Sequence, residues 1–240
     1  MALAEFYVGT SGWSYSWNPD GIGWYAENSG LNAVELNASF YRFPFPSMVR
    51  GWSRRSGLRW SIKVHRSVTH VRRMRPPGAI DALSRFLERF RPMEEAGIVD
   101  FYLFQMPPGF TAGDESWRRI TAVAEATGLG TRMAVEWRDP SWFSDEWIRR
   151  ARELGITVVS IDSPDFLFYA RSGDSVYLRM HGRTAWYAHD YSDRELDEVV
   201  ERLISLGGSR AYVFFNNDHA MLDNARRMKM KLEEIRGRSG

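Results

Sequence analysis

Eight short runs of β-branched and aromatic residues follow one another along the chain and predict eight strands. They are FYVGTS (6–11), AVELN (33–37), WSIKVH (60–65), DFYLFQ (100–105), MAVEWR (133–138), TVVSID (157–162), VYLRMH (176–181) and AYVFFN (211–216). Helical periodicity and capping residues predict helices over 22–29, 47–55, 80–91, 115–127, 145–154, 193–206 and 222–235. Because strands and helices alternate, and eight strands favour closure, we predict one (β/α)8 TIM-barrel domain over residues 1–240.

Three segments after predicted strands carry no helical pattern and are predicted to be loops. The first runs from Gly12 to Gly21 and is rich in aromatic residues, and the third runs from Gly182 to Tyr191. The second, His65 to Gly78, ends in Pro76-Pro77-Gly78, which disfavours regular structure before the next helix. Loops at these positions are where barrels carry function.

Side chains alternate between the two faces of a strand, and here the alternation separates apolar from polar residues. One face is apolar and suits packing beneath helices. The other face carries polar side chains, close to the C-terminal end of their strands: Glu35, Asn37, Lys63, His65, Gln105, Glu136, Arg138, Asp162, Arg179, His181 and Asn216. In a barrel these ends meet at one mouth, so we predict a polar site there. A mutually neutralising ionic network is the structural alternative.

The residue types at this face suit proton transfer. Glu136, Glu35, Lys63 and His181 are candidate acids and bases, because a carboxylate, amine or imidazole in a dry pocket has a shifted pKa. Glu136, Asp162 and His181 would suit Mg²⁺ or Mn²⁺, but no close-spaced motif such as HExxH occurs. We therefore predict no cofactor and leave a divalent metal open.

Composition narrows the classes of protein. The chain of 240 residues has no cysteine, which excludes disulfides and thiolate chemistry. Met1 to Glu5 is too short for a signal peptide, and no apolar run approaches the ~18 residues of a membrane span, so we expect a cytoplasmic protein without membrane contact. The net charge of +2 is small, and the one basic block lies between His65 and Arg75.

The motifs resemble those of the YecE-like family (domain of unknown function 72), which are TIM-barrel proteins. The motifs that carry the resemblance fall one per predicted strand: VGTSGW, VELNASFYR, KVHRSVTH, FQMPPGF, VEWR, DSP, LRMHG and FFNND. The resemblance implies a barrel without a defined activity. It also implies a set of characteristic polar positions: Glu35, Asn37, Tyr41, Arg42, Lys63, His70, Gln105, Glu136, Arg138, Asp162, Arg179, His181, Asn216 and Asn217.

Two functions fit these observations. The first is an enzyme, such as a hydrolase, lyase or isomerase, that applies acid/base chemistry to a phosphorylated or nucleic-acid-derived anion. In it Glu136 is the acid or base, Lys63 and Arg179 stabilise negative charge, and Asp162 and His181 orient or protonate. The arginine block with His70 holds phosphate, and Trp13 stacks on the ligand. The second is a non-catalytic barrel that binds nucleic acid, a metabolite or a protein through the same mouth.

Overall fold

The computed structural model of the protein describes residues 4–238. Its strands are β1 (Glu5–Ser11), β2 (Ala33–Leu36), β3 (Arg59–Lys63), β4 (Val99–Gln105), β5 (Met133–Glu136), β6 (Thr157–Asp162), β7 (Leu167–Phe168), β8 (Ser175–Met180) and β9 (Arg210–Phe215). Its α-helices are α1 (Gly21–Asn28), α2 (Pro46–Trp52), α3 (Gly78–Glu95), α4 (Asp114–Thr127), α5 (Asp145–Leu154), α6 (Asp193–Leu206) and α7 (Met221–Arg238). All eight predicted strands and all seven predicted helices are present.

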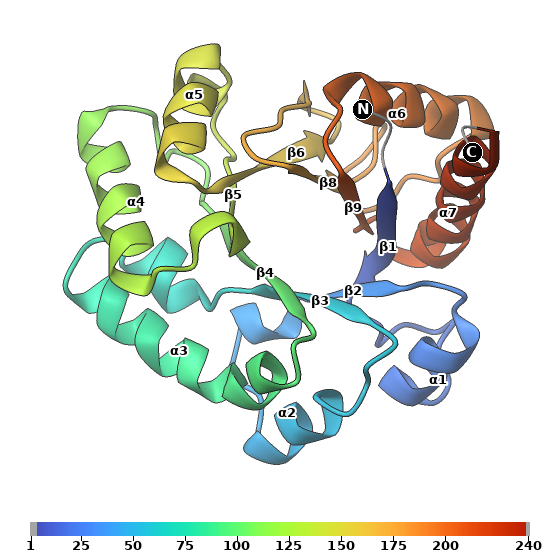
Figure 1. The fold of residues 1–240 in the computed structure, drawn as a ribbon, viewed down its shortest axis with the longest axis horizontal. Helices are drawn as coiled ribbons and strands as arrows, with labels where there is room; N and C mark the ends of the chain where they lie inside the picture. The colour runs from blue at the N-terminus through green and yellow to red at the C-terminus, as the bar shows by residue number, and fades with distance from the viewer. Residues whose placement is uncertain (1–3, 239–240) are drawn as a thin grey trace. The chain divides into compact units, whose positions relative to one another are not determined.

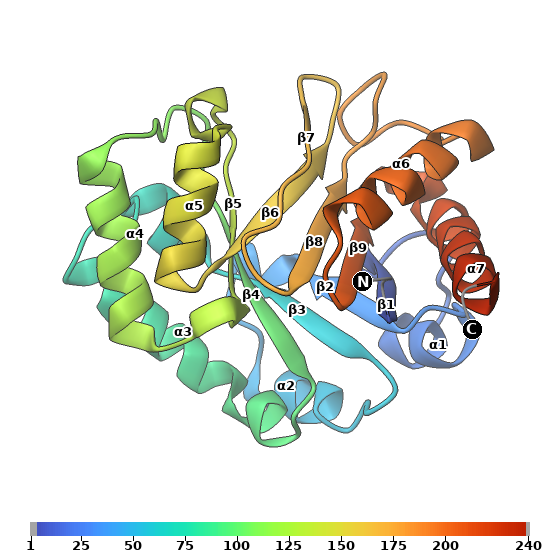
Figure 2. The same ribbon diagram turned by 45° about the horizontal axis from the view of Figure 1, so that its top comes forward.

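The elements that were not predicted include four short 3₁₀-helices, at Ala38–Phe40, Gly130–Arg132, Pro140–Trp142 and Asp218–Ala220. Two others are a strand and a turn of π-helix. β7 has two residues and pairs antiparallel with β6, so this strand turns back in a hairpin before the chain enters β8 (Figure 2). The other lies in the segment His65–Gly78, where Ser67–Val71 form a turn of π-helix, η2. The expectation of an irregular loop was therefore wrong over these five residues, because the prolines that disfavour helix come only after them.

The chain divides into two compact units. The first comprises the described residues up to Glu35, Gly57–Arg59 and the residues from Val159 onward. Its strands pair in parallel, β2 with β1, β1 with β9, β9 with β8 and β8 with β6. Helices α6 and α7 contact each other, and α7 also contacts β1 and β9 (Figure 1).

Gly9 permits a close approach of β1 and β2. A Cβ atom at this position would lie 2.2 Å from the carbonyl oxygen of Ala33. Glycine is therefore needed for contact between the two backbones.

The second unit comprises Leu36–Ser56 and Trp60–Val158. Here β3, β4 and β5 pair in parallel, and α3 contacts both α2 and α4. Tryptophans dominate part of its core: Trp142 stacks on Trp137 with ring centroids 4.9 Å apart and donates a hydrogen bond from Nε1 to the carbonyl oxygen of Phe110.

The strand order confirms the predicted fold class. The series β5-β4-β3-β2-β1-β9-β8-β6 returns to its start through a pairing of β5 with β6. Eight parallel strands in this order, with helices between them, define a (β/α)8 barrel. Among residues 4–238 no helix combines the length and the apolar character needed to cross a membrane.

Candidate functional site

Most predicted site residues lie at the C-terminal end of their own strand. Lys63, Gln105, Glu136 and Asp162 are the last residues of β3, β4, β5 and β6. His181 and Asn216 directly follow β8 and β9, and Glu35 and Arg179 are each the last residue but one of their strands.

In the first unit, Glu35 and Arg179 form a bidentate ion pair. Arg179 donates from Nη2 to Oε1 at 2.6 Å and from Nε to Oε2 at 2.9 Å, and both side chains are fully buried. The same carboxylate accepts hydrogen bonds from Tyr177 Oη at 2.7 Å and Ser11 Oγ at 2.6 Å. Because both of its oxygens accept hydrogen bonds, the carboxylate is suited to positioning Arg179 and to joining the strands.

Asp162 forms a second buried network in the same unit. Arg183 binds it through Nε at 3.1 Å and Nη2 at 2.9 Å, while Tyr169 Oη donates at 2.6 Å and Tyr191 Oη at 2.8 Å. Burial and then the Asp162 charge raise the pKa of both tyrosines, so both remain protonated donors. Arg183, Tyr169 and Tyr191 were not predicted, because they lie outside the strand faces.

His181 is buried between these networks and an aromatic loop. Its Nε2 lies 3.5 Å from Nη1 of Arg179, and its Nδ1 lies 3.2 Å from Nδ2 of Asn216. A guanidinium can only donate, so Nε2 is the acceptor in this contact. The ring also contacts Trp186, at 5.3 Å between ring centroids.

In the second unit, Lys63 and His70 share one aromatic neighbour. Nζ of Lys63 lies 4.4 Å from the ring centroid of Phe40, and the ring of His70 meets the same ring edge to face at 4.8 Å. Lys63 is 6% exposed. Ser39 ties this segment to β3, because its Oγ donates to the carbonyl oxygen of Lys63 at 2.6 Å.

His70 lies in η2, where it is half-buried. Burial lowers its pKa to about 4, and the positive charges of Lys63, Arg66, Arg138 and Arg73 add to this effect. The imidazole is therefore neutral at pH 7, and its surroundings favour an anion over a cation.

Glu136 pairs with Arg138, whose Nε donates to its Oε1. The side chain of Glu136 is fully buried, and that of Arg138 is nearly so. A buried carboxylate can donate or accept a proton when a bound ligand displaces the cationic groups beside it.

The remaining predicted residues are more dispersed. Tyr41 and Arg42 are exposed, whereas Gln105 and Trp13 are partly buried. Asn217 donates to the carbonyl oxygen of His189 at 2.6 Å and to Asn224 Oδ1 at 2.7 Å. The buried Oδ1 atom of Asn37 has no hydrogen-bond partner within the described chain.

The first unit thus brings together Glu35, Arg179, His181 and Asn216, and gives Asp162 its own network. The second brings together Lys63, His70, Arg138 and Glu136. Among the residues that the structure describes, no group of three His, Asp or Glu side chains is placed to hold a metal ion.

Comparison with known proteins identifies similar sequences and folds. A family profile described as "Protein of unknown function DUF72" matches residues 7–238. A DUF72 family protein from Thermotoga maritima is 28% identical, with a TM-score of 0.85 over 95% of this chain and 99% of that one. One from Enterococcus faecalis is 20% identical, with a TM-score of 0.82 over 95% of each chain.

More distant similarity extends to other barrels. A family 2 AP endonuclease from Brucella melitensis is 12% identical and has a TM-score of 0.53, covering 93% of this chain and 96% of that one. At this identity the likeness shows the fold alone. A search of curated proteins found no match.

Proposed function

The chain belongs to the DUF72 family of proteins of unknown function, and from this premise we propose that it is an enzyme that applies acid/base chemistry to an anionic substrate. The family name carries no activity, so the proposal rests on the residues of the second unit. Its barrel fold is compatible with many reactions and selects none of them.

The observation that carries the proposal is the concentration of positive charge around His70. Burial is the largest cause of the lowered pKa of this histidine, and the positive charges of four side chains, Lys63, Arg66, Arg138 and Arg73, lower it further. Two of them, Lys63 and Arg138, are largely removed from water. Burying cations is costly unless an anion accompanies them, and Glu136 pairs with one of them. A substrate anion among these side chains would be held by charge that is already in place.

In this proposal the residues have distinct roles. Glu136 transfers a proton to or from the substrate, because a bound anion would draw Arg138 away from it. Lys63 and Arg138 hold the negative charge, and the neutral imidazole of His70 offers a hydrogen bond. Glu35 with Arg179, and Asp162 with His181, act as positioning residues in the first unit.

Isotope incorporation tests the proposal for several classes of reaction at once. The protein is incubated with a panel of sugar phosphates and nucleotides in ²H₂O or H₂¹⁸O, and products are examined by mass spectrometry. Isomerases and lyases exchange protons with solvent, whereas hydrolases incorporate oxygen. We expect one compound class to be labelled, with the rate reduced about 10² to 10⁴-fold by Glu136→Gln.

Two further variants serve as comparison and control. Lys63→Met is expected to reduce labelling and raise KM, because it removes positive charge from the binding site. Glu125→Gln changes an exposed glutamate on α4 and should leave labelling unchanged. Thermal unfolding checks that each variant is folded. Binding of phosphorylated compounds with no labelling in any of them would contradict the proposal and favour the non-catalytic alternative.

A further inference from the structure

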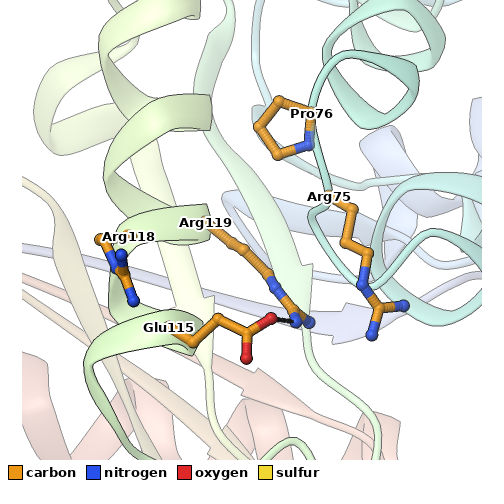
Figure 3. A pocket seen from close by; sticks show the side chains of 5 residues that line it. All are labelled: Arg75, Pro76, Glu115, Arg118 and Arg119. Carbon is orange, nitrogen blue, oxygen red and sulfur yellow. Dashed lines mark hydrogen bonds and ion pairs between the residues drawn. The ribbon is translucent and has the colours of Figure 1, made fainter.

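A second concentration of arginines lies just before α3 and in α4, and of its three arginines only Arg75 belongs to the basic block between His65 and Arg75. A pocket of about 370 Å³ is lined by Arg75, Pro76, Glu115, Arg118 and Arg119 (Figure 3). Arg75 and Pro76 precede α3, and the other three residues lie in the first half of α4. This volume is at the lower end of the range for small-ligand pockets, so it suits a small chemical group rather than a large molecule.

Three arginines and a single carboxylate, that of Glu115, line this pocket. Arg119 forms an ion pair with Glu115, and the side chain of Arg119 reaches toward it (Figure 3). Hydrogen bonding and charge from Arg119 hold the pKa of Glu115 below its usual range, and the charges of Arg75 and Arg118 lower it further. The negative charge of the Glu115 carboxylate is therefore stabilised by all three arginines.

The two side chains of this ion pair differ in their exposure to solvent. The side chain of Arg119 is 13% exposed, whereas that of Glu115 is 73% exposed. Arg119 is thus held in place by packing, while Glu115 can turn into solvent by rotation about its own side-chain bonds. Because only the glutamate of this pair is exposed, a phosphate that takes its place on Arg119 keeps the largely buried guanidinium paired with an anion.

We propose that this arginine pocket binds a terminal phosphate group, which replaces the carboxylate of Glu115 on Arg119. Three arginines against one glutamate leave two positive charges, and a phosphate monoester carries close to two negative charges at pH 7. Planar guanidinium groups bind phosphate oxygens through paired hydrogen bonds, which an ammonium group does not offer. The proposal is independent of any reaction at Glu136.

Binding of phenyl phosphate, followed by NMR on the arginine Nε–Hε signals, tests the proposal. We expect the signals of Arg75, Arg118 and Arg119 to shift together. Arg119→Gln should weaken binding about 10-fold or more, and Arg75→Gln or Arg118→Gln about 3-fold each. Glu115→Gln should strengthen binding several-fold, because it removes the competing charge while preserving the size of the side chain.

Matched variants separate this pocket from the site around His70. Arg149→Gln alters an exposed, ion-paired arginine on α5 and should leave phenyl phosphate binding unchanged. Lys63→Met should likewise leave the signals of the pocket arginines unchanged. An oligothymidylate without terminal phosphates provides the backbone-phosphate probe, and it should bind more weakly than phenyl phosphate.

Two results would overturn the proposal. One is binding that neither Arg119→Gln nor Glu115→Gln alters. The other is binding of the oligothymidylate without binding of phenyl phosphate, because the ligand would then be a backbone phosphodiester rather than a terminal phosphate.

Discussion

Arg179 and Glu35 are 144 residues apart in the chain and form a fully buried ion pair through two hydrogen bonds of 2.6 and 2.9 Å. The pair links β8 to β2. Tyr177 and Ser11 complete the hydrogen bonding of the carboxylate. Such a pair is costly to break on one side only, because the remaining charge stays buried without its partner.

Arg179→Met is expected to lower the free energy of unfolding by about 3–5 kcal/mol, since it leaves the Glu35 carboxylate uncompensated. The double variant Glu35→Gln with Arg179→Met should recover part of this loss, because no charge remains at either position. Urea denaturation measures both effects. If the single variant lowers the free energy of unfolding by less than about 1 kcal/mol, the ion pair is not buried as described above.

Gly9→Ala is expected to destabilise the protein by about 1–3 kcal/mol or more, because backbone atoms cannot move aside from the new methyl group. The added Cβ would lie 2.2 Å from the oxygen and 2.5 Å from the carbonyl carbon of Ala33. Gly51→Ala is the matched control. Gly51 lies in α2 with open space around it, so alanine there should be neutral or stabilising. Equal denaturation midpoints for the two variants would contradict this account of the contact between β1 and β2.

The lowered pKa of His70 makes stability depend on pH. Between pH 6.5 and about 4 the unfolded chain binds a proton at this residue while the folded protein does not. Stability therefore falls as the pH decreases through this range. At 1.36 kcal/mol per pH unit the effect has an upper limit of about 3 kcal/mol, and the partial exposure of the ring reduces it to about 1–2 kcal/mol.

His70→Gln should remove this component, so that the variant gains stability relative to the parent protein when both move from pH 7.5 to pH 4. Urea denaturation at the two pH values gives the comparison. His219→Gln is the control, because His219 is 76% exposed. The idea fails if the two variants show the same pH dependence.

The sequence predicted best those features that depend on local pattern. The helix Asp193–Leu206 was predicted with its observed bounds, because Ser192 and Glu195 form a capping box and Gly207 follows the last turn. Alternation along β2 and β8 placed Glu35 and Arg179 on polar faces for a similar reason.

Features that depend on pairing between distant residues could not be predicted. Nothing in the sequence states that Arg179 binds Glu35 or that Arg183 binds Asp162, because such pairs follow from strand register and loop conformation. The two-residue strand β7 is too short to show a period. The turn of π-helix at Ser67–Val71 has only five residues, so His70 was expected in an irregular loop.

The central claim is that the cationic surroundings of His70 bind an anion, and the titration of this imidazole tests it most directly. The pKa of His70 is measured by NMR with and without inorganic phosphate at constant ionic strength. It should start near 4 and rise by about one pH unit or more when phosphate binds, because a neighbouring anion stabilises the imidazolium. Lys63→Met should raise the starting value and reduce the change. A pKa near 6.5 without phosphate, or one that phosphate does not alter, would contradict the claim.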